Sequence, residues 1–390
     1  MQRMPTSFSP NSNRSLKSSD AKKRSQRLII VGALLLLGIS VLVLYIILTG
    51  ATRRTTKDPF VATTTDSGAA TSTSLTLRHL DGMPVNPGQE ALRPIAVMID
   101  NQADAQPWSG VDQASLVIES PVEGGITRLM AMFDRLGAPT STKIGPVRSA
   151  RPYFVDWALS WDAGYAHVGG SPEALQKIQA LGTTFGNLDE MANGSTFSRD
   201  RNRAAPHNVY TTVDALTQTM EHRYGTSTAT FSSWRFEPLA TSTDAVVAAS
   251  SVRVPYGGSY SISWRFDPMI GKYRRYKGTN IQKTAEGKEL LAANIVVIKT
   301  DAQVLDEKGR LSVRTIGSGD AVIYRAGKKY VARWSRSSGE VMRFEGADGS
   351  EYLLTAGPTW IQVTTDDRVF AGLGPSTASP TAATSTVSTQ

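Results

Sequence analysis

The fold of this chain can be worked out from the stretch Lys143-Ile144-Gly145-Pro146-Val147-Arg148-Ser149-Ala150-Arg151-Pro152-Tyr153-Phe154. The residues at its end predict a helix, because Phe154, Trp157 and Trp161 fall on one face at helical spacing. Pro152 suits the first turn of that helix, where a missing N–H loses no hydrogen bond. The stretch therefore predicts a strand-to-helix entry of the kind found in α/β folds.

Arg148, Ser149 and Arg151 stand directly before this helix. A helix N-terminus has free N–H groups and a dipole that favours negative charge, so two arginines at this point predict an anion site. The alternative is that both arginines pair with carboxylates of the same domain, as most charged surface residues do.

Short apolar runs before and after this stretch predict strands, and helical patterns separate some of them. A second helix entry follows one run, with Ser171 as N-cap and Pro172 as the first helical residue. Residues 85–235 therefore predict a mixed α/β domain. The predicted strands are Ile95–Ile99, Ser115–Ile118, Arg128–Phe133 and Gly164–Val168.

The sequence after residue 252 alternates differently, with period-two or fully apolar runs that glycine-containing turns divide. We expect a smaller β-rich domain at 253–372, joined to the first domain by a linker at 236–252. The predicted strands are Tyr260–Phe266, Ile295–Ile298, Ala321–Tyr324, Tyr330–Trp334 and Trp360–Val363.

An uncharged apolar run at 28–48 is long enough to span a membrane and too long for a cleaved signal peptide, so we interpret it as a signal anchor. Seven basic residues and one acidic residue lie in the predicted cytoplasmic tail 1–27, and only three basic residues follow closely. The positive-inside rule then places the N-terminus in the cytoplasm and the body outside the cell membrane. Residues 49–84 predict a Ser/Thr-rich stalk and 373–390 a disordered tail.

The formal charge of +8 belongs to the tether, because 1–27 carry a net +6 and 51–58 a net +2. The remaining body is neutral, which disfavours a nucleic-acid partner. The chain has no cysteine, so it has neither a disulfide nor a cysteine for lipid attachment. Its four histidines lack paired ligand spacing, and we expect no metal and no cofactor. Protein partners and oligomeric state cannot be read from these features.

Polar residues gather where the predicted strands end, which is where open α/β sheets bind ligands if the strands are parallel. We expect a ligand site here, with Asp100 and His167 as candidate catalytic residues. A loop rich in arginine adds further residues. The candidate ligand-binding residues are Asp100, Asn101, Glu123, Arg128, Arg148, Ser149, Arg151, His167, Ser171, Arg199, His207 and Asn208.

Structural roles compete with these assignments. Asp100 and Asn101 are residues that commonly cap turns. His167 lies in an apolar run, where a hydrogen-bonded core histidine is about as expected as a proton-transfer group.

Seven segments together form a specific pattern: Arg93–Asn101, Val122–Arg128, Ile144–Phe154, His167–Pro172, His207–Tyr210, Gly317–Ala321 and Gly357–Ile361. These segments resemble the YerB-like family of bacterial surface lipoproteins, whose members contain the N- and C-terminal domains of unknown function 3048. The resemblance implies an extracytoplasmic α/β domain followed by a small β-rich one, and no established activity. Many members resemble lipoproteins, whereas this chain has an apolar run and no cysteine.

We therefore expect a membrane-anchored protein that binds an anionic or polyhydroxylated cell-envelope ligand. One alternative is a phosphoryl or glycosyl transferase acting on cell-wall precursors, since a strand-end aspartate with converging arginines is similar in arrangement to the LytR-CpsA-Psr phosphotransferases. A second alternative is an envelope scaffold without a small-molecule site.

Overall fold

The computed structural model describes residues 75–137, 142–225, 228–238, 251–256 and 260–370. The predicted tail 1–27, the signal anchor 28–48 and the disordered tail 373–390 lie outside these residues. Within the described ranges, no helix is both long and apolar enough to cross a membrane.

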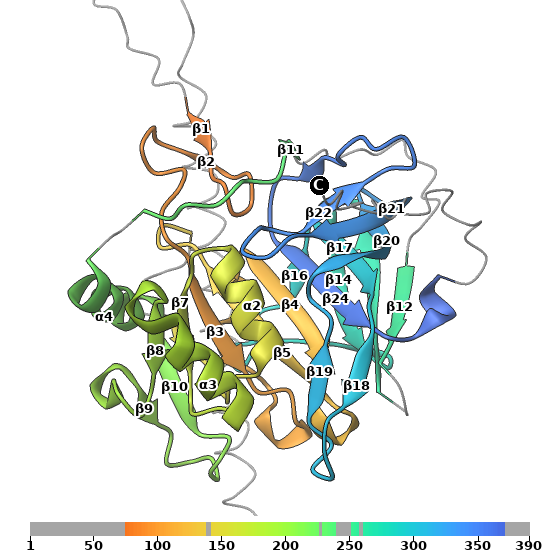
Figure 1. Ribbon diagram of the computed structural model, residues 1–390. Coiled ribbons are helices and arrows are strands. Elements are labelled where there is room, and N and C mark those ends of the chain that lie inside the picture. The colour runs from red at the N-terminus through yellow and green to blue at the C-terminus, as the bar shows by residue number, and fades with distance from the viewer. Residues whose placement is uncertain (1–74, 138–141, 226–227, 239–250, 257–259, 371–390) are drawn as a thin grey trace, which may run out of the picture. The chain divides into compact units, whose positions relative to one another are not determined.

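A ten-stranded sheet runs through the described part of the chain (Figure 1). In spatial order its strands are β22 (Arg343–Glu345), β21 (Lys328–Arg336), β20 (Gly317–Arg325), β17 (Asn294–Lys299), β24 (Thr359–Thr364), β4 (Leu116–Pro121), β5 (Thr127–Phe133), β3 (Ile95–Ile99), β7 (Gly164–His167) and β8 (Asn187–Asp189).

The centre of the sheet joins the two halves of the chain. β24 pairs in parallel with β4, with Trp360 opposite Val117 and Ile361 opposite Ile118, and β17 continues the parallel set. On the other side β3, β7 and β8 are parallel, while β5 lies antiparallel between β3 and β4. The two segments that the sequence separates as domains therefore share one sheet.

Helices α2 (Pro152–Ser160) and α3 (Pro172–Leu181) lie in front of the sheet in Figure 1. The buried face of α2 packs on alternate residues of the central strands, such as Met98 and Met130. The opposite face of the sheet packs on α4 (Val213–Tyr224) through Leu216. Both faces of the sheet are covered, which explains why its central strands are apolar throughout.

A second sheet consists of β12 (Ser251–Pro255), β13 (Ser261–Asp267), β14 (Lys272–Lys277) and β15 (Asn280–Ile281), with β16 (Leu291–Ala292) paired to β14. It shares the α4-side core, where the rings of Trp264 and Trp360 lie 5.0 Å apart. The shorter pairings are β1 (Thr76–Leu77) with β2 (Pro84–Val85), β10 (Val209–Thr212) with β6 (Lys143–Ile144) and β9 (Ser198–Arg199), β11 (Phe236–Glu237) with β23 (Leu354–Thr355), and β18 (Ala302–Val304) with β19 (Leu311–Val313).

A buried ion pair links the two sheets. Arg275 of β14 donates from Nη2 to Glu119 Oε2 of β4 at 2.7 Å, and neither side chain is exposed. The Arg275 guanidinium also lies 5.1–5.8 Å from the ring centroids of Trp108, Trp264 and Trp360. Burial alone would lower the pKa of Arg275, but Glu119 and Tyr260 together more than offset this effect and the pKa is raised, so the arginine stays charged.

The predicted strands and helix starts are confirmed in place, with ends shifted by a few residues. Pro152 opens α2, and Ser171 caps α3 by accepting from Ala174 N at 3.3 Å. The described residues are mostly β with few helices, and all three described α-helices lie between 152 and 224. The boundaries of the linker 236–252 stay a prediction, since 239–250 lie outside the described residues.

The predicted stalk extends too far toward the body. Residues 75–84 are part of the fold, since Leu80 is buried and Arg78 pairs with Asp81 at 2.7 Å and Asp134 at 2.8 Å. The prediction rested on polar composition, whereas an ion pair shielded from water holds this segment.

We expect the unit Ser72–Gln390 to unfold in one cooperative transition, because β24 and β4 are hydrogen-bonded neighbours in one sheet. Differential scanning calorimetry should give a calorimetric enthalpy equal to the van't Hoff enthalpy. Two separated transitions would show that the halves fold independently.

Candidate functional site

The candidate residues lie at the edge of the large sheet where β3, β4 and β7 end and the antiparallel β5 begins. The segment 147–151 crosses this edge. Arg148 N donates to Met98 O of β3 at 2.8 Å, and Ala150 N donates to Gly169 O, just past β7, at 3.0 Å. These backbone bonds place the arginines of the segment above the strand ends.

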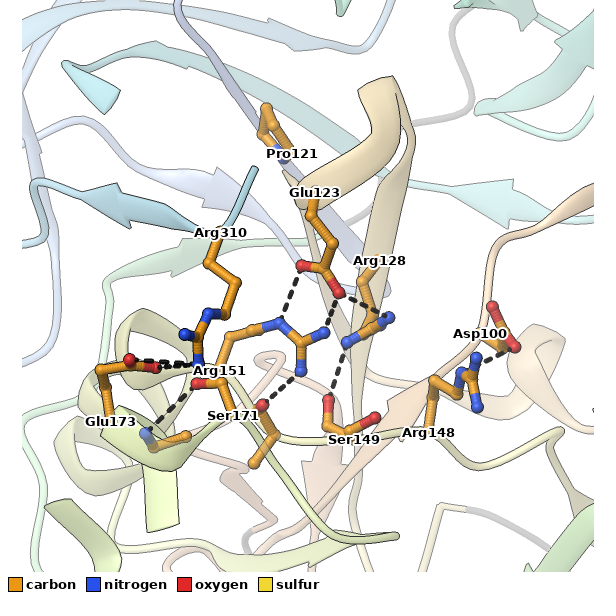
Figure 2. A network of polar contacts seen from close by, with 12 residues as sticks. Asp100, Pro121, Glu123, Arg128, Arg148, Ser149, Arg151, Ser171, Glu173 and Arg310 are labelled. Carbon is orange, nitrogen blue, oxygen red and sulfur yellow. Dashed lines mark hydrogen bonds and ion pairs between the residues drawn. The ribbon is translucent and has the colours of Figure 1, made fainter. Parts of the chain in front are cut away.

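Glu123, Arg128 and Arg151 form one polar cluster (Figure 2). Arg151 donates from Nε to Glu123 Oε2 at 2.9 Å and from Nη2 to Oε1, and its Nη1 donates to Ala150 O at 2.7 Å. Arg128 donates from Nη1 to the backbone oxygen of Ser149 at 3.0 Å. Gly124 and Gly125, with φ values of 77° and 70°, form the turn that returns the chain from Glu123 into β5, a geometry that favours glycine.

Positive charge exceeds negative charge in this cluster. Two guanidinium groups share the Glu123 carboxylate, and Arg128 Nη2 is 4.0 Å from it, beyond hydrogen-bond distance. Arg128 is 3% exposed, and its Nε has no partner among the described residues. Burial, together with repulsion from Arg151, lowers the pKa of Arg128 to about 10. A second anion close to Arg128 would relieve this cost.

The pKa of the Glu123 carboxyl is lowered, because here the favourable interactions outweigh burial. Burial alone would raise the pKa of its carboxyl, but the hydrogen bond and charge of Arg151 lower it. Since the folded-state pKa lies below the unfolded value, this pair contributes stability at neutral pH. That contribution is lost as the pH falls through the folded pKa.

Asp100, Arg148 and His207 form a second cluster beside the first. The Asp100 carboxylate is fully buried; its Oδ2 lies 2.7 Å from His207 Nδ1 and 3.2 Å from Arg148 Nε. Its Oδ1 accepts from the backbone N–H of Gln102 at 3.1 Å. The buried carboxylate therefore orients both side chains, and neither the two Arg148 Nη atoms nor His207 Nε2 has a hydrogen-bond partner among the described residues.

His167 lies apart from both clusters. Its ring is fully buried in β7, and its two nitrogens lie 2.8 Å from Gly169 O and 2.8 Å from Asn187 Oδ1. This is the arrangement of a hydrogen-bonded core histidine, which is the structural alternative considered for it. At this edge the histidine that a carboxylate orients is His207, through the contact of its Nδ1 with Asp100.

The remaining candidate residues Ser171, Asn101, Arg199 and Asn208 lie outside both clusters. Ser171 caps α3, and Asn101 turns to the opposite side of the sheet, where its Nδ2 lies 2.6 Å from Thr127 Oγ1. Arg199 and Asn208 lie on the exposed β9 loop, with Arg199 donating to Glu190 at 2.8 Å.

Sequence reasoning missed the residues that support this edge from the C-terminal half. Arg310, on the turn between β18 and β19, lies 3.2 Å from Glu173 in the first turn of α3 (Figure 2). It also pairs with Asp306. Glu119 and Arg275 were missed too. A charged residue inside the apolar run of β4 was the available signal for Glu119.

No group of three or more His, Asp or Glu side chains in the described ranges is placed to hold a metal ion. The three arginines at the edge are hydrogen-bond donors, which suit an anion.

Comparison with known proteins identifies the family. Residues 80–227 match the N-terminal domain, and residues 252–361 the C-terminal domain, of the family described as "Protein of unknown function (DUF3048)". "Putative lipoprotein YerB" of Bacillus subtilis (strain 168) is 31% identical over 283 residues, which cover 70% of this chain and 82% of that protein. A crystal structure of the YerB protein from Bacillus subtilis has a TM-score of 0.67 and 26% identity, covering 75% of this chain and 98% of that one. The resemblance noted in the sequence is thus confirmed, and this chain belongs to the YerB-like family.

Proposed function

We propose that this protein is a membrane-anchored, extracytoplasmic member of the family that binds an anionic group of a cell-envelope molecule at the strand edge. The lipoprotein name of the Bacillus subtilis relative supports membrane attachment with the body outside the cytoplasm. This chain has no cysteine to carry a lipid, and the apolar run 28–48 supports a helical anchor in its place.

Topology provides the first test of this proposal. A protease added to intact cells should remove the body and leave the basic tail 1–27 protected, because positive charge is retained on the cytoplasmic side. An antibody against an N-terminal tag would detect the protected fragment, and permeabilised cells provide the control. A body that resists protease in intact, but not in permeabilised, cells would contradict the topology.

The excess of positive charge at the edge carries the binding proposal. Arg151 is paired with Glu123, and Arg128 is buried. These two arginines therefore contribute a positive electrostatic potential at the edge without being free to bind a ligand directly. Arg148 is the arginine that remains partly exposed, with 23% of its side chain accessible and only Nε near a carboxylate. Its two Nη groups present the paired donors that suit a phosphate or carboxylate group.

Inorganic phosphate is the simplest probe of this site. Arg148→Gln should weaken phosphate binding by about 1.5–3 kcal/mol, because it removes charged hydrogen bonds, and lower the thermal midpoint only slightly, because His207 and the Gln102 N–H still contact the Asp100 carboxylate. Arg151→Gln should lower the midpoint more, since it leaves Glu123 without its main partner. Isothermal titration and thermal melts measure the two effects, with the exposed Arg201→Gln as a charge-matched control. Equal phosphate binding by the parent and Arg148→Gln would contradict the assignment.

The Asp100 and His207 pair favours a second candidate function, a hydrolase or transferase acting on the bound ligand. A buried carboxylate on His Nδ1 holds the tautomer that leaves Nε2 to accept a proton, and Arg148 beside it would hold the anionic group.

A turnover assay separates this function from binding alone. If envelope material is converted, His207→Gln should lower turnover about 100-fold or more while phosphate binding is kept, because glutamine cannot transfer the proton. His167→Gln serves as the control histidine and should act through stability instead. Turnover that survives His207→Gln would remove His207 from the mechanism.

A further inference from the structure

A cavity of about 480 Å³ opens between the two halves of the chain, and its lining includes no residue of the two clusters described above. One wall is the loop 106–108 that follows β3, and the other is the end of β14 with the β15 turn. Its lining residues are Gln106, Pro107, Trp108, Lys277, Asn280, Gln282 and Lys283. This volume lies within the roughly 300–1,000 Å³ of small-molecule sites, which often occur at domain interfaces.

The charged residues of the lining are all basic. The lining has two lysines and three carboxamides, and none of the seven residues is acidic. Neither Lys277 nor Lys283 forms an ion pair with a described carboxylate, and Gln282 Oε1 is buried without a partner among the described residues. Ammonium groups bind carboxylate or phosphate, while carboxamides both donate to and accept from hydroxyl groups.

Hydrogen bonds to the buried polar network hold the 106–108 wall. Gln106 Nε2 donates to Asn101 Oδ1 at 2.8 Å, and Lys277 Nζ lies 3.5 Å from Gln106 Oε1. Asn101 in turn is 3.3 Å from Glu119, the partner of Arg275. The amide of Gln106 therefore has a fixed orientation toward Lys277.

The opposite wall is tied to the same network. Gln282 N donates to Arg275 O at 2.9 Å. Ala285 N donates to Trp108 O at 2.7 Å, and this bond joins the segment after β15 to the first wall. The cavity is thus formed by two segments far apart in the sequence and held in place before any ligand arrives, which lowers the entropic cost of binding.

We propose that this cavity binds a small anionic polyol, a sugar that carries a carboxylate or a phosphate. The lysines would bind the anionic group and the carboxamides of Gln106, Asn280 and Gln282 the hydroxyls. None of the lining residues belongs to the sheet edge that carries Arg128, Arg148 and Arg151, the arginine edge, so different side chains test the two proposals. The two sites are joined where Trp108 Nε1 donates to Asp100 O at 2.7 Å.

Isothermal titration of the full chain in non-ionic detergent tests the proposal with glucuronic acid, glucose 1-phosphate and glucose. We expect saturable binding of at least one anionic sugar, with glucose at least about tenfold weaker. Binding of only one anionic probe would identify the anionic group as carboxylate or phosphate. No saturable binding of either up to about 10 mM, or equal binding of glucose, would overturn the proposal.

Four variants locate the site. Lys277→Gln and Lys283→Gln should each weaken binding about three- to tenfold. Asn280→Asp should weaken the anionic sugars similarly at unchanged side-chain size, because it adds a negative charge. Lys329→Gln on β21, an exposed lysine outside the cavity, should have no effect.

Arg148→Gln distinguishes this site from the arginine edge. It should leave unchanged the sugar binding that the two lysine variants weaken, and remove only additional binding of the anionic group at the edge. Loss of sugar binding in Arg148→Gln, with the two lysine variants unaffected, would assign the sugar to the edge and overturn the cavity assignment.

Discussion

The Glu119 and Arg275 ion pair is the interaction on which the rest of the structure depends. Glu119 lies on a strand of the first half of the chain and Arg275 on a strand of the second, and both are fully buried. Removing two charges from water costs several kcal/mol each, and the pair repays this only while both partners stay in place. Tyr260 and Thr127 add hydrogen bonds to Glu119, at 3.0 Å and 2.7 Å. The pair therefore fixes how the second sheet packs on the first.

The two candidate sites depend on this packing in different ways. The cavity lies directly on the network, since Gln106 reaches Glu119 through Asn101 and Gln282 is bonded to the backbone of Arg275. The arginine edge lies on the side of the same sheet that α2 and α3 cover, and Arg310 of the second half reaches it by pairing with Glu173. A ligand at the edge would mainly neutralise charge, whereas a ligand in the cavity would contact both halves.

The sequence was sufficient for the strands, the helix starts and the convergence of charge. Helical spacing after Pro152 and the cap at Ser171 are local patterns, and apolar runs of strand length require no knowledge of their neighbours. Asp100 and Glu123 reach one edge because β3 and β4 run in the same direction, as the prediction required, and backbone hydrogen bonds of the segment 147–151 bring Arg148 and Arg151 to that edge. The antiparallel β5 did not disturb this, since Arg128 lies at its start.

Pairings between distant residues could not be predicted. Asp100 and His207 are 107 positions apart, so spacing alone gave no reason to prefer His207 over His167 as its partner. Arg275 lies in Lys272–Lys277, where alternation puts Tyr273 and Arg275 on the inner face, but a run of basic residues indicates a solvated surface on composition alone. The sharing of one sheet by both halves depends on β24 pairing with β4, which no local pattern encodes.

A double-mutant cycle on Glu119 and Arg275 tests this account most directly, with stability measured by urea unfolding of Ser72–Gln390. Arg275→Met and Glu119→Gln should each cost about 3–5 kcal/mol, because each leaves a buried charge without its partner. The double variant should cost at least about 2 kcal/mol less than their sum, since neither charge then remains. Additive losses would show that the two residues act independently and would contradict the central role of the pair.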